Sequence, residues 1–101
     1  MTPQPHLVAE ETLEFAASMF KLLGHPLRLR LVEVLDACGE MNVNDLADLT
    51  EQSQSTVSFY LNRLRTSGIL EKRRDGNQTY YSVSEPRIAT LLSCLRGCPL
   101  Q

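Results

Sequence analysis

The sequence predicts a mainly α-helical domain that carries one small β-hairpin. Apolar residues recur at helical spacing along most of the chain, and Gly and Pro residues separate these stretches. Strand-like residues flank a single Asp75-Gly76 pair, which is typical of a hairpin turn. The predicted order is therefore four helices, a hairpin and a final helix.

Composition indicates one ordinary globular domain. The chain has 101 residues, of which 43% are hydrophobic and 22% charged, and no apolar run approaches the ~20 residues of a membrane span. Residues 1–7 resemble a flexible leader and show no export signal, so we expect a single domain at 8–101 in a soluble, cytoplasmic protein without a membrane partner. The odd number of cysteines, three, suggests reduced thiols.

The first two predicted helices meet at Gly24-His25-Pro26. The first, at about 8–23, is apolar on two faces and so needs cover from its own core and from a second subunit. The second begins near Pro26, which suits a first helical turn, and ends at Gly39. His25 is expected to cap or pack at the start of this helix rather than to bind metal.

A short helix and a longer one follow, joined by a tight turn. Asn44 is the better N-cap candidate for the short helix at 45–49, with Asn42 the alternative. Ser53 is expected to cap the longer helix, which Gly68 ends. In this helix Val57, Leu61 and Leu64 recur at positions i, i+4 and i+7 and form the predicted core stripe.

The rest of the domain is a two-stranded ribbon and a last helix. The expected strands are 69–74 and 78–83, with one of Tyr80 and Tyr81 facing the core and the other facing solvent. Glu85-Pro86 opens the last helix, and Gly97 and Pro99 end it. Its apolar stripe consists of Ile88, Leu91, Leu92 and Leu95.

This order is that of a winged helix-turn-helix, whose second helix enters the DNA major groove by its N-terminal end. With the core stripe turned inward, the outward residues supply hydrogen-bond donors and acceptors for bases and an apolar surface for thymine. These residues are Gln54, Ser55, Thr56, Ser58, Phe59 and Asn62. Net charge is −2, yet five of the ten basic residues lie in the twelve-residue window 63–74. The expected phosphate contacts are Arg63, Lys72, Arg73 and Arg74.

The segments "LLGHPLRLRLVEVL" and "VNDLADLTEQSQSTVSFYLNRLRTSGILEKRRDGNQTYYSV", together with the terminal helix, resemble the ArsR/SmtB family of bacterial repressors. The resemblance covers nearly the whole chain, from about residue 15 to residue 98. It implies a homodimer built by the first and last helices and a double-stranded inverted-repeat DNA operator. It also implies release from DNA by an inducer.

The family's metal sites are missing from this sequence. Where the arsenic-sensing branch has Cys-Val-Cys-Asp-Leu, residues 42–46 read Asn-Val-Asn-Asp-Leu. Zinc- and nickel-sensing members place Asp and His on the last helix, and residues 85–101 contain neither. Persulfide-sensing relatives use one cysteine in the second helix, which corresponds to a position near Glu33 here, and one near the end of the last helix, which Cys98 matches.

Three cysteines remain as candidates for the inducer site: Cys38, Cys94 and Cys98. On a continuous helix Cys94 and Cys98 flank the apolar stripe, with Cβ atoms roughly 6 Å apart. They could be packing residues, a thiol switch that is oxidised or takes up sulfur, or ligands of trivalent arsenic or a soft metal. In the last case the third thiol comes from Cys38 or from the partner chain.

Other functional classes fit less well. The sequence has no Gly-rich phosphate loop and no pattern of nucleophile and base, so neither an enzyme nor a required cofactor is expected. One alternative is a winged-helix regulator without a cysteine-based inducer. Another is a winged helix used for protein contacts, in which Phe59 and Tyr60 dock on a partner.

Overall fold

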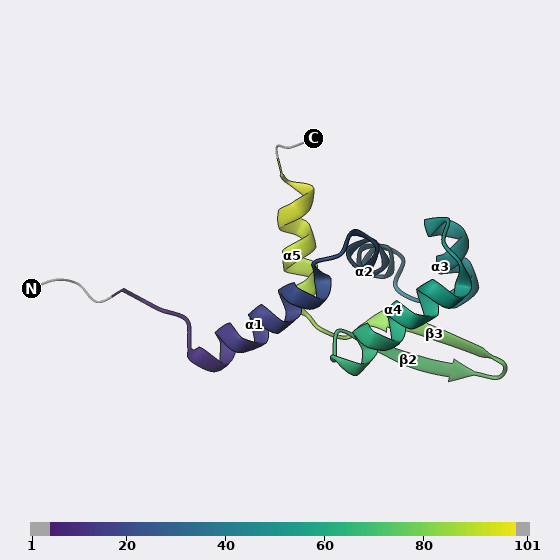
Figure 1. Ribbon diagram of the computed structural model, residues 1–101, viewed down its shortest axis with the longest axis horizontal. Helices are drawn as coiled ribbons and strands as arrows, with labels where there is room; N and C mark the ends of the chain where they lie inside the picture. The colour runs from purple at the N-terminus through teal and green to yellow at the C-terminus, as the bar shows by residue number, and fades with distance from the viewer. Residues whose placement is uncertain (1–4, 99–101) are drawn as a thin grey trace, which may run out of the picture.

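The computed structural model describes residues 5–98 and confirms a mainly helical fold with a β-hairpin wing (Figure 1). Its elements are α1 (Glu10–Leu23), α2 (Pro26–Cys38), β1 (Met41–Asn42), α3 (Val43–Thr50), α4 (Gln54–Thr66), β2 (Leu70–Asp75), β3 (Gln78–Val83) and α5 (Arg87–Arg96). In the described part of the chain, no helix is long and apolar enough to cross a membrane. Residue 99, where a proline was expected to end the last helix, lies outside this part.

The predicted ribbon is confirmed as the β2–β3 hairpin, but the sheet has a third antiparallel strand that was not predicted, and the strand order is β1-β3-β2. Met41 pairs with Tyr81, and Asn42 pairs with Tyr80. A strand of two residues is too short to show alternation of apolar and polar side chains, so β1 could not be predicted from the sequence. The first hairpin strand also runs one residue later than expected, since Asp75 still pairs with Gln78 across the turn.

Side-chain caps fix where the helices begin. The Oδ1 atom of Asn42, rather than Asn44, accepts a 2.8 Å hydrogen bond from the backbone N–H of Asp45, so α3 begins two residues earlier than expected. The other two caps confirm the prediction. His25 Nδ1 accepts from the N–H of Leu27 at 3.2 Å, and Ser53 Oγ accepts from the N–H of Thr56 at 3.1 Å.

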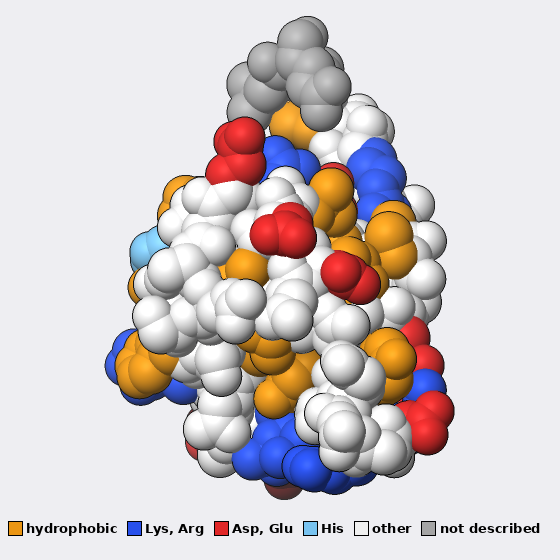
Figure 2. Space-filling view, turned by 90° about the vertical axis from the view of Figure 1, so that its right-hand side faces the viewer, with side chains coloured by type: hydrophobic (Ala, Val, Ile, Leu, Met, Phe, Trp, Pro, Cys, Tyr) orange, Lys and Arg blue, Asp and Glu red, His pale blue; other side chains and the backbone are white. Residues whose placement is uncertain are grey.

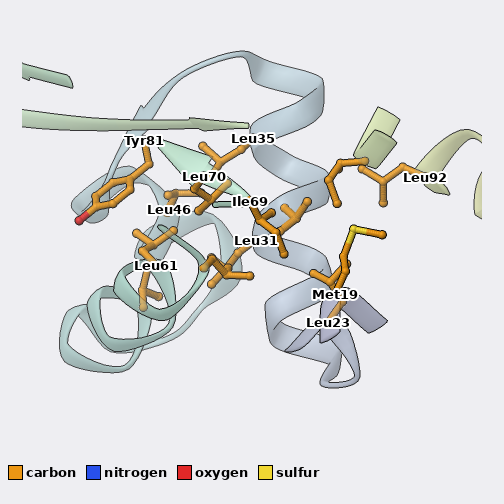
Figure 3. Close-up of a cluster of buried hydrophobic side chains, with 14 of the residues drawn as sticks. Met19, Leu23, Leu31, Leu35, Leu46, Leu61, Ile69, Leu70, Tyr81 and Leu92 are labelled. Atoms are coloured by element: carbon orange, nitrogen blue, oxygen red, sulfur yellow. The ribbon is translucent and has the colours of Figure 1, made fainter. Parts of the chain in front are cut away.

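The hydrophobic core joins every helix to the sheet. The predicted stripe of α4, Val57, Leu61 and Leu64, is fully buried. Figure 3 shows Leu31 of α2 and Ile69 between two groups of side chains, one around Leu46, Leu61 and Tyr81, the other around Met19, Leu23 and Leu92. Because α2 contacts α1, α3, α4, α5 and β3, it is the central element of the domain.

The helices α1 and α5 lie at the end of the molecule away from α3 and the hairpin tip (Figure 1). The N-terminal half of α1 extends from the rest, and the radius of gyration is 16.0 Å, against about 13 Å for a compact chain of this length. Leu13 and Phe20 on α1 are 56% and 54% exposed, and Leu95 of the predicted α5 stripe is 44% exposed. Each helix therefore has an apolar face that its own chain leaves uncovered.

An ion pair at the start of α5 holds an arginine side chain against α1. The carboxylate of Glu85, which is buried, accepts hydrogen bonds from the backbone N–H of Arg87 at 2.7 Å and from its guanidinium at 2.7 and 2.9 Å. That guanidinium lies over the ring of Phe15, 4.2 Å from its centre. The hydrogen bonds from the Arg87 side chain and backbone hold the pKa of Glu85 below its ordinary value.

This contact makes a pH-dependent contribution to folding. A carboxylate whose pKa is lower in the folded state stabilises the fold above its ordinary pKa and loses that effect as the pH falls through its folded value. Glu85→Gln should lower the free energy of unfolding by about 1–2 kcal/mol at pH 7, measured by urea denaturation at fixed protein concentration. The difference from the wild-type protein should shrink below about pH 4. Glu14→Gln, at an exposed position of α1, is the control; an equal loss in that variant, or a difference that does not change with pH, would contradict this role.

Candidate nucleic-acid interface

One end of the molecule brings together the N-terminal end of α4 and the hairpin. In Figure 1 the start of α4, α3 and the hairpin tip all lie at the same end. Figure 2 views this end and shows Lys and Arg side chains gathered at its lower edge, where the hairpin lies. Burial of the α4 stripe determines which residues of α4 this surface displays, because opposite sides of one helix cannot both face the core.

The predicted base-reading residues lie on the exposed side of α4. Gln54, Ser55, Ser58 and Asn62 are exposed, and Thr56 is half-buried. Their side chains are not equally free. Thr56 Oγ1 accepts a 2.8 Å hydrogen bond from the capping Ser53, and Asn62 Oδ1 accepts one from Arg65 at 2.9 Å. Gln54 and Ser58 form no side-chain hydrogen bond within residues 5–98, so their polar groups are available to a ligand.

Phe59 and Arg63 form the adjoining part of this surface. Phe59 is 57% exposed, and the Arg63 guanidinium lies 5.5 Å from its ring centre. The Phe59 ring also contacts Tyr60 edge-on at 5.6 Å. Tyr60 in turn packs beside His25 and beneath Arg28, whose Nη1 donates a 3.0 Å hydrogen bond to the carbonyl of Leu22. This packing joins the middle of α4 to the α1–α2 turn.

The three basic residues of β2 divide between two faces of the hairpin. Strand pairing places Lys72 opposite Tyr81 and Arg74 opposite Thr79. Because side chains alternate along a strand, Arg73 lies on the other face, opposite Tyr80. Lys72 and Arg74 are exposed and form no ion pair within the described residues, so both cations are available to phosphate.

Arg73 is exposed but already has partners. Its guanidinium donates to the Glu40 carboxylate at 2.9 and 3.0 Å, which keeps the pKa of Glu40 below its ordinary value and raises that of Arg73. It also lies 5.0 Å from the ring centre of Tyr80. Sequence reasoning missed Glu40, because the two residues are 33 positions apart and only strand pairing brings them together.

Acidic side chains occupy part of the same end. Asp45, Asp48 and Glu51 of α3 and its C-cap are exposed. Asp45 in the first turn suits the positive end of the helix dipole. Positive charge at this end is therefore local to the hairpin and to Arg63 rather than spread over the whole face.

The three cysteines form no disulfide in the structure. Cys94 on α5 and Cys38 at the end of α2 are exposed, and Cys98 is half-buried. The helix α5 ends at Arg96, so Cys98 lies past the helix, and the positions expected of a continuous helix apply to Cys94 alone. Within residues 5–98, no three His, Cys, Asp or Glu side chains are grouped closely enough to hold a metal ion. A three-thiol site made by one protomer is therefore not formed in this structure.

Comparison with known proteins agrees with this geometry. The profile described as "Bacterial regulatory protein, arsR family" matches residues 25–72, which run from the start of α2 into β2. The transcriptional repressor PagR of Bacillus anthracis is 31% identical over 95% of this chain and 94% of its own, and its crystal structure superposes with a TM-score of 0.79.

Two other solved structures share the fold. The antimony-specific transcriptional repressor AntR is 30% identical over 91% of this chain and 86% of its own, with a TM-score of 0.81. Mb0332 of Mycobacterium bovis, described as a homodimeric winged helix-turn-helix DNA-binding domain, is 27% identical over 92% and 87%, with a TM-score of 0.73. The relatives are regulators rather than enzymes. The chain described here belongs to the ArsR family of bacterial regulatory proteins.

Proposed function

We propose that this protein is a DNA-binding transcriptional repressor that acts in the cytoplasm as a homodimer. One observation carries the proposal: a capped helix, α4, exposes its polar N-terminal half beside a hairpin with unpaired cations. Such a pair can place one helix in the major groove while the hairpin contacts the backbone. PagR, AntR and the M. bovis domain, described as repressors or as DNA-binding, support this function.

The exposed groups divide into two kinds of DNA contact. Gln54, Ser55, Ser58 and Asn62 carry the donors and acceptors that read base edges, and Phe59 offers an apolar surface to a thymine methyl. The free cations, Arg63, Lys72 and Arg74, are suited to phosphates, which hold the protein in register without reading sequence. Thr56, which is committed to the helix cap, has a structural role first.

A homodimer through α1 and α5 follows from their uncovered apolar faces. Leu13, Phe20 and Leu95 are large apolar side chains exposed in the single chain, and all lie on these two helices. Burying them against a second copy releases free energy in proportion to the area removed from water. Two-fold pairing presents two copies of α4 to the same side of a duplex, about one helical turn apart, which is the spacing of an inverted repeat.

We further propose that a thiol-directed inducer releases the protein from DNA by acting on Cys94 and Cys98, with Cys38 as an additional candidate. Cys94 lies on α5 next to Leu95, an exposed residue of the proposed dimer helix, and Cys98 follows two residues after the helix ends. Thiolates are soft ligands that suit arsenite or antimonite, and exposed thiols also react with persulfides and oxidants. Cys94 and Cys98 would supply two of three thiol ligands, and the third would come from Cys38 or from the partner chain. AntR, described as antimony-specific, is consistent with such an inducer.

Release requires only that the inducer favour one arrangement of the dimer. Linking thiols on α5 changes how the two copies of α5 pack, and therefore changes the distance between the two α4 helices. A coupling free energy of about 1–3 kcal/mol changes operator affinity roughly 5- to 150-fold. No ordered segment has to unfold.

DNA binding can be tested by fluorescence anisotropy on duplex DNA from upstream of the protein's own coding sequence, between 50 and 200 mM salt. Each phosphate contact contributes about 0.9 to the slope of log K against log salt for each copy that makes it. Lys72→Gln and Arg74→Gln should each weaken binding and reduce this slope, whereas Gln54→Ala should weaken binding to the operator at an unchanged slope. Base readout of this kind is worth about 1–3 kcal/mol.

Lys21→Gln is the matched control, because Lys21 is an exposed cation at the end of α1. Its salt slope should equal that of the wild-type protein. Binding that is insensitive to salt would favour a protein-contact surface anchored on Phe59, and no binding to DNA would refute the repressor function.

The inducer can be tested in the same assay with reduced protein, by adding arsenite, antimonite or an inorganic persulfide donor. One of these agents should weaken DNA binding at least fivefold. Cys94→Ser or Cys98→Ser should abolish that response without changing DNA affinity in its absence. Cys38→Ser tests whether Cys38 is the third ligand, because only then should this variant lose the response. A response that survives in the Cys94→Ser/Cys98→Ser variant would contradict the proposed site.

A further inference from the structure

We infer that Arg73 does not contact DNA but positions the wing through Glu40. This inference rests on the proposed function, because it divides the basic residues of the hairpin into those that bind DNA and one that holds the hairpin in place. It departs from the expectation that Arg63, Lys72, Arg73 and Arg74 all bind phosphate.

The contacts of Arg73 form a bridge across the sheet, which we call the wing tether: Arg73, Tyr80 and Glu40. The strands lie in the order β1-β3-β2, with Arg73 on the outer strand β2 and Tyr80 opposite it on β3. Glu40 immediately precedes β1 on the far side. The guanidinium passes over the Tyr80 ring, and its Nε and Nη2 atoms donate to the two carboxylate oxygens at 3.0 and 2.9 Å.

This geometry is stronger than that of an ordinary surface ion pair. An isolated exposed pair contributes little, because solvent screens it and two long side chains lose freedom. Here both oxygens accept from one planar guanidinium, an arrangement that arginine makes and lysine cannot. Asp75 adds a second carboxylate 3.6 Å from Nη1. To reach a phosphate, Arg73 would have to give up both hydrogen bonds and the aromatic contact.

The wing tether lies where it can stabilise the outer part of the hairpin. β1 pairs only with Tyr80 and Tyr81, so the outer part of the hairpin has no third strand beside it. A two-stranded ribbon is marginal by itself. Glu40 lies between the end of α2 and the start of α3, and it ties β2 to the segment that leads into the helix-turn-helix. The tether therefore fixes the direction in which Lys72 and Arg74 are presented relative to α4.

The test combines amide hydrogen exchange of the free protein with the salt slope of DNA binding, for the wild-type protein, Arg73→Gln, Glu40→Gln and the control Lys72→Gln. Arg73→Gln and Glu40→Gln should both speed exchange of the hairpin amides, from Arg74 to Thr79. Arg73→Gln should also weaken DNA binding about three- to tenfold, as expected when a segment must be ordered on binding, at an unchanged salt slope. Lys72→Gln should do the reverse, reducing the slope and leaving exchange unchanged.

Three results would overturn the inference. A salt slope reduced in Arg73→Gln as much as in Lys72→Gln, at unchanged exchange, would make Arg73 a phosphate contact. Unchanged exchange of the hairpin amides in Glu40→Gln would show that the Glu40 carboxylate does not stabilise the hairpin. An unchanged affinity in Arg73→Gln would remove any role in binding. If the wild-type protein binds no DNA, the proposed function fails, and the exchange measurements still decide whether Glu40 and Arg73 hold the hairpin.

Discussion

The burial of one side of α4 is the constraint on which the rest of this structure depends. Val57, Leu61 and Leu64 are fully enclosed by α2, α3 and the sheet, and this fixes the rotation of α4 about its own axis. Because the buried stripe occupies one side of α4, the polar residues of its N-terminal half face solvent on the opposite side. A single cavity in this stripe would do more than lower stability, because a helix that can rotate no longer presents a defined set of donors and acceptors.

The same core separates the molecule into two ends with different tasks. The end with α4 and the hairpin is polar and locally basic, whereas the end with α1 and α5 exposes Leu13, Phe20 and Leu95. The central helix α2 contacts elements at both ends. Because protein interiors are close-packed, we expect a change in the pairing of two protomers to move α4 as part of a rigid body. By this route the proposed chemistry at Cys94 or Cys98 would change the proposed DNA contacts of α4, although neither cysteine lies on that helix.

Much of the fold could be predicted from the sequence, because its signals are local. The α4 stripe, the cap at Ser53 and the hairpin turn each involve residues within a few positions of one another, and all three were confirmed. The two-residue strand β1 was missed, because its existence depends on a partner about 40 residues further along the chain. The cap of α3 was misplaced for a related reason. Asn44 was preferred to Asn42 on local grounds, whereas pairing with β3 places Asn42 at the end of β1 and directly before α3.

The candidate site also combines features that local sequence signals predict with features that depend on distant residues. Sequence periodicity sufficed to identify the exposed residues of α4, since exposure follows from the position of the stripe. It could not identify which exposed side chains already have partners. Asn62 is bonded to Arg65 and Arg73 to Glu40, and the second of these contacts depends on strand pairing. Counting basic residues therefore overestimates the charge available to phosphate, which for the wing is that of Lys72 and Arg74.

Hydroxyl-radical footprinting of the upstream DNA shows directly whether a two-fold protein presents two copies of α4 to one face of a duplex. We expect two protected segments related by inverted symmetry, with centres about one helical turn apart, and two protomers bound per duplex. A single protected segment occupied by one protomer, or no protection at concentrations where the protein is folded, would contradict this arrangement.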